Sequence, residues 1–404
     1  MKKIGYFIGQ FPSPSHTYFW REINDLRDLG LDVDISSTQL PKTEIAKHAW
    51  VDTCISQTIY LYPMGLKHVL QSFAVLLLAF PMGWYRCLKS IALADVNGLQ
   101  ERFKLLAYMI IGARLAAVAK QQKWEHFHVG FCADAANIAL FARLLGGPTY
   151  SLTLHSALDD FGSNQIQKWS NAKFGTAVSN NLLEELKQRI GKGLPPTSVV
   201  PMGVDVKKLV RKSAYNPWQH KETLIIFCGA RLTPKKGQLD LLQAAAIIKS
   251  KGVNVEVRLA GEDMGADKWY TNKLKSVAQE LGLSDSLKLL GTISEAQVYD
   301  ELHNAHVFVL ASYAEGMSVA VMEAMGIGVP VVTTNVDGLP DLVTDHKTGL
   351  IISPGDIDAL ANKILYLVEH PEFALEITKN AMNDIRQHHR SELGAMLLAQ
   401  KINS

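Results

Sequence analysis

Two glutamates stand at a spacing that could place both at one ligand. Glu315 lies in the loop after the apolar run 307–310, and Glu323 lies eight residues later, in a helix that we expect to begin near Ser318. A strand, a glycine-containing loop and a helix direct unpaired backbone N–H groups at an anion in α/β folds. Apolar residues flank Glu323, and a carboxylate held there usually needs a partner such as a ligand hydroxyl. The alternative is an acidic loop residue followed by a solvated helix carboxylate.

Two cations stand at a second strand end. Arg231 and Lys236 lie five residues apart, after the run 224–228 and before an amphipathic stretch. Guanidinium and ammonium groups suit phosphate oxygens, and open parallel sheets bind ligands at the carboxyl ends of their strands. The alternative is a basic loop bounded by Pro234 and Gly237.

Histidines and an aspartate follow or occupy strand-like runs in the first half. His155 ends the run 150–154, so we expect it to project from the carboxyl edge of the first sheet across a cleft. The alternative is a strand-end histidine bonded to a neighbouring carbonyl. His126 and His128 alternate on another run, and we expect structural roles for both. Asp134 is either an acceptor-side carboxylate or the N-cap of a helix.

The elements that hold these side chains alternate along the whole chain. Short β-branched runs are followed by helical stretches, which is typical of parallel sheets covered on both faces. We expect an α/β fold with two Rossmann-like domains, residues 1–206 and 207–387, and a final helix at about 388–404 that packs back on the first domain. The expected strands are 4–8, 33–36, 128–132, 150–154, 174–178 and 198–200, then 224–228, 255–260, 287–290, 307–310, 331–333 and 350–352.

The composition argues against several classes of protein. Lys plus Arg total 41 and Asp plus Glu total 39, so no overall field favours nucleic acid. Neither half contains a GxGxxG or GxxxxGK[ST] loop, which disfavours dinucleotide-dependent dehydrogenases and P-loop enzymes. The four cysteines are scattered without a CxxC pair, as expected for buried thiols in a reducing compartment. The longest strongly apolar segment, 73–80, is too short to span a bilayer. These features predict a cytoplasmic protein.

One segment departs from the balanced charge. Between residues 62 and 123, only Asp95 and Glu101 oppose eight cations, and apolar and aromatic residues such as Trp84 lie among them. The cations are Lys67, Arg86, Lys89, Arg102, Lys104, Arg114, Lys120 and Lys123. A cationic, amphipathic face that bears aromatic rings suits an anionic membrane surface. The alternative is an ordinary solvated helix surface.

Several short motifs follow one another in a fixed order along nearly the whole chain. They include Phe11-Pro12-Ser13-Pro14-Ser15-His16, Thr153-Leu154-His155-Ser156, Pro201-Met202-Gly203-Val204-Asp205, Gly229-Ala230-Arg231 with Lys235-Lys236-Gly237, and the pair Glu315 and Glu323. In this order they resemble glycosyltransferase family 4, the retaining nucleotide-sugar transferases of the GT-B fold, especially the exopolysaccharide and colanic acid type. The chain departs from the family pattern where His16 replaces a usual Glu and Ser156 replaces a usual Gly.

The resemblance implies a role for each matching residue. Arg231 and Lys236 would hold the donor diphosphate, Glu323 the ribose hydroxyls and Glu315 the donor sugar. His155 would approach the transferred sugar. Further donor contacts would come from Gly229, Gly291, Thr292, Ile293, Gly316, Met317 and Ser318, and acceptor contacts from Ser15, His16 and Asp134. We expect neither a metal nor another cofactor, since two cations and a helix terminus balance the leaving diphosphate.

The resemblance therefore predicts a retaining hexosyltransferase. It would move a hexose from a nucleoside diphosphate sugar to a lipid-linked or growing surface polysaccharide at the inner face of a bacterial membrane. A UDP-sugar is the favoured donor, and a GDP-sugar is the alternative. One alternative is a nucleotide-sugar epimerase or hydrolase on the same fold. Another is a glycan-binding assembly subunit without activity.

Overall fold

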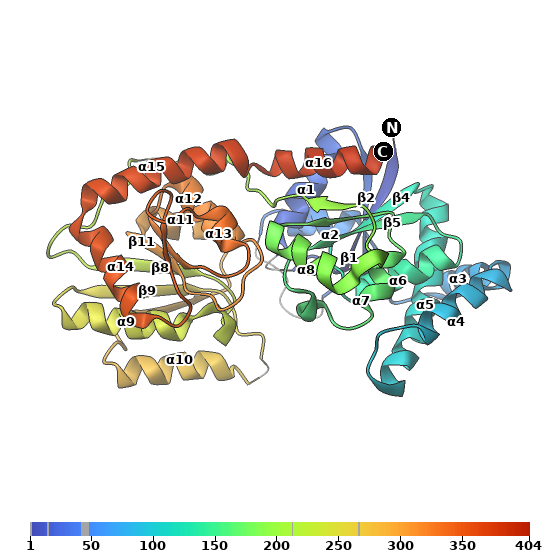
Figure 1. Cartoon of the computed structure of the whole chain (residues 1–404), viewed down its shortest axis with the longest axis horizontal. Coiled ribbons are helices and arrows are strands. Elements are labelled where there is room, and N and C mark those ends of the chain that lie inside the picture. Colours follow the sequence, from blue (N-terminus) through green and yellow to red (C-terminus); the bar gives the residue numbers. More distant parts are fainter. Residues whose placement is uncertain (1, 14–15, 42–47, 212, 266) are drawn as a thin grey trace. The chain divides into compact units, whose positions relative to one another are not determined.

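Each half of the chain folds around its own parallel β-sheet (Figure 1). The computed structural model describes all residues except 1, 14, 15, 42–47, 212 and 266. It divides the chain into a first unit of residues 1–201 with 394–404 and a second unit of residues 202–393. The first unit thus ends five residues before the boundary that we expected from the sequence.

The first unit holds a seven-stranded sheet in the order β3-β2-β1-β4-β5-β6-β7. All neighbouring strands run parallel, with Tyr6 opposite both Ile35 and His128. The strands are β1 (Lys3–Gln10), β2 (Asp32–Gln39), β3 (Thr58–Tyr60), β4 (His126–Val129), β5 (Thr149–Leu154), β6 (Phe174–Ala177) and β7 (Thr197–Val199).

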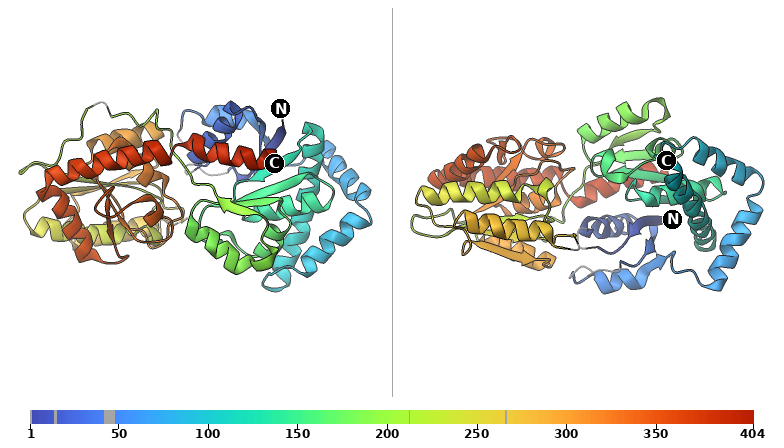
Figure 2. Two further views of the ribbon diagram at one scale, coloured as in Figure 1. Left: turned by 45° about the horizontal axis from the view of Figure 1, so that its top comes forward. Right: turned by 90° about the horizontal axis from the view of Figure 1, so that it is seen from below.

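Helices connect these strands and cover the sheet (Figure 2). They are α1 (Thr17–Asp28), α2 (Val51–Gln57), α3 (Leu66–Leu78), α4 (Met82–Ala92), α5 (Gly98–Gln122), α6 (Asp134–Leu144), α7 (Gln165–Ser170) and α8 (Asn180–Ile190), with short 3₁₀ turns η1 (Leu158–Phe161) and η2 (Gly191–Gly193). The helices α3, α4 and α5 lie between β3 and β4 in the chain and form a separate helical layer at the edge of this unit (Figure 1).

The second unit holds a six-stranded parallel sheet in the order β10-β9-β8-β11-β12-β13. Its strands are β8 (Leu224–Gly229), β9 (Val255–Ala260), β10 (Leu287–Gly291), β11 (Val307–Leu310), β12 (Val331–Thr334) and β13 (Leu350–Ile352). Its helices are η3 (Pro234–Lys236), α9 (Gln238–Ser250), α10 (Trp269–Glu280), α11 (Glu295–Asn304), α12 (Val319–Ile327), α13 (Leu339–Leu342), α14 (Ile357–Glu369) and α15 (Pro371–His388).

The last helix, α16 (Ser391–Asn403), returns to the first unit. Its buried residues Ala395, Leu398, Ala399 and Ile402 join the core formed by residues of β1, α1 and β2. The Lys2 ammonium donates a hydrogen bond to the carbonyl of Ile402. The strand β1 and the helix α16 therefore share one hydrophobic core.

The expected α/β architecture with two parallel sheets is confirmed, with two local corrections. The strand expected at 128–132 runs from His126 to Val129, so residues 130–132 belong to the loop that follows it. The edge strand β3 was not expected, because it follows α2 directly, with no loop between them to mark its start.

No single described helix combines the length and apolar composition needed to cross a bilayer. The pair α3 and α4 meets that test jointly, with a bend of 92° between the two helices.

Candidate functional site

The candidate site in the second unit lies where the order of its strands reverses. From β8 the chain proceeds to β9 and β10 on one side, and then returns to place β11 on the other side of β8. The loops after β8 and β11 therefore diverge at the carboxyl edge, which is where open α/β sheets bind ligands. Arg231 and Lys236 lie in the first of these loops, and Glu315 lies in the second.

A glycine allows the two loops to touch. Gly237 has a left-handed backbone with φ of 65°, and a Cβ atom there would lie 1.9 Å from the carbonyl oxygen of Ala311. Any side chain at this position would push the loops apart. The Tyr313 N–H donates a hydrogen bond of 2.8 Å to the carbonyl of Lys235. The turn that carries Lys236 is thereby fixed against the loop after β11.

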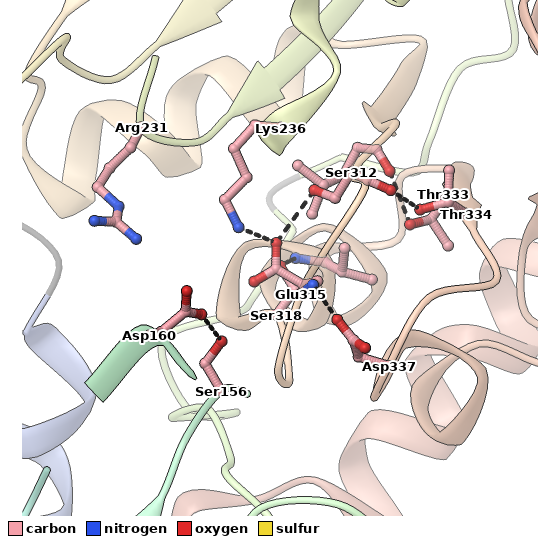
Figure 3. Close-up of polar contacts among 12 residues, drawn as sticks. Ser156, Asp160, Arg231, Lys236, Ser312, Glu315, Ser318, Thr333, Thr334 and Asp337 are labelled. Atoms are coloured by element: carbon pink, nitrogen blue, oxygen red, sulfur yellow. Dashed lines mark hydrogen bonds and ion pairs between the residues drawn. The ribbon is translucent and has the colours of Figure 1, made fainter. Parts of the chain in front are cut away.

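Lys236 and Glu315 form an ion pair at the centre of the site (Figure 3). Lys236 Nζ lies 2.5 Å from Glu315 Oε2, and the two side chains are only 13% and 15% exposed. The Ser312 hydroxyl donates a hydrogen bond of 3.3 Å to the same carboxylate oxygen. From the sequence we had given Lys236 and Glu315 to different parts of a ligand, and the structure brings them together as direct partners.

The loop after β12 holds the backbone of Glu315 in place. The Glu315 N–H donates to Asp337 Oδ2 at 2.7 Å, and the Gly338 N–H donates to the Glu315 carbonyl at 3.3 Å. The Thr334 hydroxyl donates to the carbonyl of Ser312 at 2.6 Å (Figure 3). Sequence reasoning missed Asp337, although it carries the signal that identified Arg231, a polar side chain shortly after an apolar strand.

The helix α12 begins directly after this loop. Ser318 is its N-cap, and its side chain accepts a hydrogen bond from the Val321 N–H at 3.4 Å. The preceding residues Gly316 and Met317 are buried, and the first N–H groups of a helix have no acceptor within it. Glu323 lies in the second turn and is 8% exposed, so it is buried as its apolar neighbours predicted.

Arg231 extends from the loop after β8 and is exposed. Its carbonyl accepts a hydrogen bond of 2.9 Å from Gln238 Nε2, which ties this loop to α9. Among the described residues, its guanidinium forms no ion pair. Its N–H donors remain available to an anionic ligand.

The expected donor contacts Gly291, Thr292 and Ile293 lie at the end of β10, next to the end of β9. The Gly261 N–H donates to the carbonyl of Gly291 at 2.9 Å, and the Thr292 hydroxyl donates to Glu262 at 3.1 Å. A Cβ atom at Gly261 would lie 1.9 Å from the carbonyl of Ala230, so the loops that follow β8 and β9 also touch. Gly291, Thr292 and the partly buried Ile293 thus border the Arg231 loop on the side away from β11.

The first unit has an equivalent reversal between β1 and β4, and aromatic rings fill it. The ring of His155, just after β5, lies 5.2–5.5 Å from the rings of Tyr18, Phe19 and Phe131. His16 joins the same cluster, with its ring 5.3 Å from Phe19 and 5.5 Å from Phe131. The structure therefore brings His16 and His155 together.

Burial, with smaller contributions from the neighbouring His128 and His16, lowers the pKa of His155 to about 3, although a hydrogen bond with the Gly130 backbone raises it. At neutral pH the ring is uncharged. It can exchange a hydrogen bond with a sugar hydroxyl, but it does not supply a positive charge.

The other acceptor-side candidates are placed differently. Asp134 is the exposed first residue of α6 and forms a side-chain hydrogen bond with Tyr108 of α5, which contributes to raising the pKa of that phenol. Ser15 lies outside the described residues.

His126 and His128 belong to a buried chain of hydrogen bonds. Ser151 Oγ bridges them, at 2.9 Å from His126 Nε2 and 2.8 Å from His128 Nδ1. The other ring nitrogens bond to Thr149 at 2.9 Å and Thr153 at 3.0 Å. Burial lowers the pKa of both rings to about 3. The chain joins β4 and β5 through neutral side chains.

Sequence reasoning also missed a buried lysine. Lys168 of α7 is fully buried, and its ammonium donates to the carbonyls of Cys132 at 2.6 Å and Phe161 at 3.3 Å. Burial lowers its pKa to about 8. It ties the loop after β4 to η1, and a lysine in a short polar helix gives no sequence signal for such a role.

Residues 211–384 match the family model of the glycosyl transferases group 1. Over 393 residues, the chain is 28% identical to the amylovoran biosynthesis glycosyltransferase AmsK of Erwinia amylovora, covering 90% of each protein. It is 24% identical over 277 residues to a GDP-mannose-dependent mannosyltransferase of Corynebacterium glutamicum that acts on a monoacylated phosphatidylinositol monomannoside, covering 64% of this chain and 70% of that protein.

The fold is similar to that of solved glycosyltransferases. The structure of Anabaena HepE in complex with UDP and glucose superposes with a TM-score of 0.75 at 18% identity, covering all of both chains. A sucrose-phosphate synthase from Thermosynechococcus elongatus gives a TM-score of 0.74 at 19% identity, covering 100% of this chain and 98% of the other. The two-domain fold expected from the sequence is confirmed.

Proposed function

We propose, from the glycosyl transferases group 1 match of residues 211–384 and the similarity to the glycosyltransferase AmsK, that the second unit of this glycosyltransferase binds a nucleoside diphosphate sugar and transfers the hexose with retention at the anomeric carbon. The observation that carries the proposal is the set of groups at one strand reversal. Lys236 paired with Glu315, the exposed Arg231 and the N-terminus of α12 all lie on the loops after β8 and β11.

These groups suit a leaving diphosphate. Two cations and unpaired helix N–H groups stabilise the negative charge that develops on phosphate oxygens as the glycosidic bond breaks. Glu315 already neutralises Lys236, so an incoming diphosphate would have to share the ammonium with that carboxylate. We propose that Glu315 also contacts the sugar and that Glu323 accepts the ribose hydroxyls. Because Arg231, Lys236 and the helix N–H groups would face the diphosphate without a metal, turnover should be unaffected by EDTA.

The donor and acceptor are proposed from the relatives. A UDP-sugar is favoured because the similar HepE structure binds UDP, and a GDP-sugar is the alternative because the corynebacterial relative depends on GDP-mannose. The acceptor is a lipid-linked or growing surface polysaccharide, since AmsK acts in amylovoran biosynthesis and the corynebacterial relative extends a phospholipid glycoside.

A donor screen tests this proposal. Thermal shifts of the full chain would be measured with UDP-, GDP- and ADP-sugars, because a ligand at 100 times its dissociation constant adds about 2.7 kcal/mol to stability. One donor class should raise the melting temperature, and the product with an acceptor glycan should keep the donor's anomeric configuration by NMR. Release of an epimer or of free sugar as the main product would favour the epimerase or hydrolase alternative. Absence of any shift would favour an inactive binding subunit.

We also propose that the layer of α3, α4 and α5 rests on an anionic membrane. Helix α3 is apolar toward the outside, the reverse of a water-facing helix. Its packed side is polar in the first half and apolar in the second, where Val75 and Leu76 pack against core residues of α4, α5 and α6. Its outer stripe consists of Leu66, Leu70, Phe73 and Leu77, which are 61–78% exposed. Its packed side carries His68, Gln71 and Ser72, and Gln71 accepts a hydrogen bond of 2.9 Å from the buried Arg114 of α5.

The two neighbouring helices continue this surface. Leu99, Phe103, Leu106 and Ile110 are exposed along one face of α5, and the exposed cations Arg86 and Lys89 stand among aromatic and aliphatic side chains on α4. Exposed apolar stripes of this extent need a cover. Cations beside apolar groups suit an anionic bilayer surface.

Vesicle flotation tests the membrane proposal. Reversal of Arg86 and Lys89 to Glu should release the protein from anionic vesicles, because each basic side chain near the surface contributes about 1 kcal/mol. Transfer to a soluble acceptor should be unchanged. The matched control reverses Lys187 and Lys192, which are exposed on α8 and η2 of the same unit. Equal binding to neutral and anionic vesicles, or none to either, would contradict the proposal.

A further inference from the structure

Two hollows of different chemistry adjoin at Gly146 in the first unit. One, of about 430 Å³, is lined mainly by apolar side chains, among them Val75, Leu78, Ala116 and Leu145. The other, of about 370 Å³, is lined by Arg86, Arg143, Leu144, Gly146, Ser170 and Asn171. Both lie beside the turn that joins α3 to α4, at the base of the exposed apolar layer. Neither belongs to the charged site of the second unit or to the aromatic cluster around His155.

The polar hollow suits a phosphate group. It presents two guanidinium groups, and no carboxylate is among the residues that line it. Arg143 donates one N–H to the carbonyl of Gly147 at 3.1 Å, which leaves most of the five donors of a guanidinium group. Arg86 forms no ion pair within the part of the chain that the structure describes. A pair of such guanidinium groups is a preferred partner for phosphate oxygens.

The remaining polar side chains of this hollow are fixed by their own helix. The Ser170 hydroxyl donates to the carbonyl of Ile166 at 2.6 Å, and Asn171 Nδ2 donates to the carbonyl of Gln167 at 2.9 Å. The hydroxyl and amide are therefore held at the end of α7, where they form a polar part of the lining.

The apolar hollow suits a hydrocarbon chain. Val75 and Leu78 come from the end of α3, Ala116 from α5 and Leu145 from the end of α6. Its volume lies within the range of small-molecule sites. A free phosphate ion would use only the polar hollow, whereas a phospholipid would use both. We infer that the two hollows together form a site for one phosphate-bearing lipid, with the headgroup between Arg86 and Arg143 and the start of an acyl chain along Leu78 and Leu145.

This inference deepens the proposed membrane face and rests on it. The apolar stripes of α3 and α5 would bring the protein to any bilayer. The paired arginines would then retain one lipid by its phosphate, in the way that basic pockets beside apolar helices bind lipid headgroups. The layer would thereby select membranes rich in anionic phospholipid.

Binding of dihexanoyl phosphatidate to the full chain, measured by calorimetry below the micelle concentration of this lipid, tests the polar half. Arg86→Gln and Arg143→Gln should each weaken binding about tenfold, the loss expected for one charge-assisted contact. Arg143→Lys keeps the charge and should recover part of the affinity, which separates the phosphate contact from the contact with Gly147. Lys187→Gln, on exposed α8 of the same unit, should bind like the wild type. Wild-type affinity in Arg86→Gln and Arg143→Gln, or no binding by the wild type, overturns the inference.

The apolar half separates lipid from free phosphate. Leu78 is 77% exposed and lines the apolar hollow, while Leu93, directly after α4, is 61% exposed and lines neither hollow. Leu78→Gln should lower the affinity for dihexanoyl phosphatidate several-fold and leave the affinity for inorganic phosphate unchanged. Leu93→Gln should change neither affinity. If inorganic phosphate binds as tightly as the lipid and Leu78→Gln has no effect, the occupant is free phosphate and the inference is wrong.

Vesicle flotation and thermal shifts with the donor sugar distinguish a failure of this inference from a failure of the proposed function. Arg143→Gln should still give the wild-type thermal shift with the donor sugar, and it should still float with vesicles while its preference for phosphatidate over phosphatidylcholine is lost. Loss of donor binding in the wild type would contradict the proposed function alone. Unchanged preference for phosphatidate in Arg143→Gln, with vesicle binding intact, would contradict only the lipid site.

Discussion

The two sheets of this protein reverse their strand order in the same way, but different chemistry occupies the two reversals. In the second unit, the loops after β8 and β11 carry Arg231 and the pair Lys236 and Glu315. In the first unit, the loops after β1 and β4 carry His16 and Phe131, which pack with His155. One reversal is charged and the other is aromatic with neutral histidines.

The difference shows what a shared architecture leaves open. Parallel strands and right-handed connections create a crevice wherever the order reverses, whatever side chains are present. A charged crevice can stabilise a leaving diphosphate, whereas an aromatic crevice can position a sugar ring through apolar contact and hydrogen bonds. The first unit also carries the apolar layer of α3, α4 and α5, which has no counterpart between strands of the second unit.

The largest expected effect is at the charged reversal. Lys236→Met should lower turnover about 10²- to 10³-fold, because about 2–4 kcal/mol of charge stabilisation in the transition state is lost. Steady-state transfer assays measure this loss, and Lys235→Met, an exposed neighbour in the same turn, is the control. Because Lys236 and Glu315 are direct partners, the double variant with Glu315→Gln should lose less than the sum of the single losses. Additive losses would mean that the two side chains act independently.

Glu315 and Glu323 should differ in what they bind. Glu323→Gln should lower the affinity for the free nucleoside diphosphate about 10-fold or more, because a charged acceptor for the ribose hydroxyls is lost. Glu315→Gln should chiefly lower turnover. The affinity of this variant for the free nucleotide should not fall, since the substitution releases Lys236 from its partner. Calorimetry with the nucleoside diphosphate distinguishes the variants. Wild-type nucleotide affinity in Glu323→Gln would contradict the ribose role.

Substitution of His155 at the aromatic reversal should change turnover more than nucleotide affinity. His155→Ala should lower turnover with the complete donor by about tenfold, the contribution of about one hydrogen bond to the transition state, and affinity for the nucleoside diphosphate should hardly change. The control is His128→Ala, which breaks the buried chain to Ser151 and Thr153 and should lower the melting temperature instead. A destabilised His155→Ala with normal turnover per folded molecule would assign His155 to the structure alone.

The smallest effect concerns pH. Burial lowers the pKa of His126, His128 and His155 to about 3, so below pH 6.5 the unfolded chain takes up protons that the folded chain does not, and stability falls as pH falls. Glu22, which accepts a hydrogen bond of 2.6 Å from Tyr6, opposes this, because burial raises its pKa to about 7. Between pH 7 and pH 6 the net loss is about 1 kcal/mol, or about 2–4 °C in melting temperature.

Thermal melts across this range test the sign. Replacement of Glu22 by Gln removes the opposing contribution and should steepen the loss toward acid pH. A melting temperature that rises from pH 7 to pH 6 in both proteins would show that the three histidines are protonated in the folded state.

The sequence alone determined which residues stand at strand ends. Apolar runs shortly before Arg231, Glu315 and His155 place these side chains at the carboxyl edge of a sheet, because a parallel strand must be apolar on both faces and its polar neighbours follow in the loop. The order of the motifs also identified the class of enzyme. Both inferences depend on signals within a few residues or on a linear order, which the chain displays directly.

Only the tertiary structure decided which of these side chains meet. Lys236 and Glu315 are 79 residues apart and become partners because β11 returns beside β8 and Gly237 lets their loops touch. Asp337 reaches Glu315 from the next strand in the same way. The outward face of α3 was equally undetermined, because its sequence pattern shows an apolar stripe but not the direction in which it points. Direction and partnership depend on contacts between distant segments, and these are set by packing rather than by local sequence.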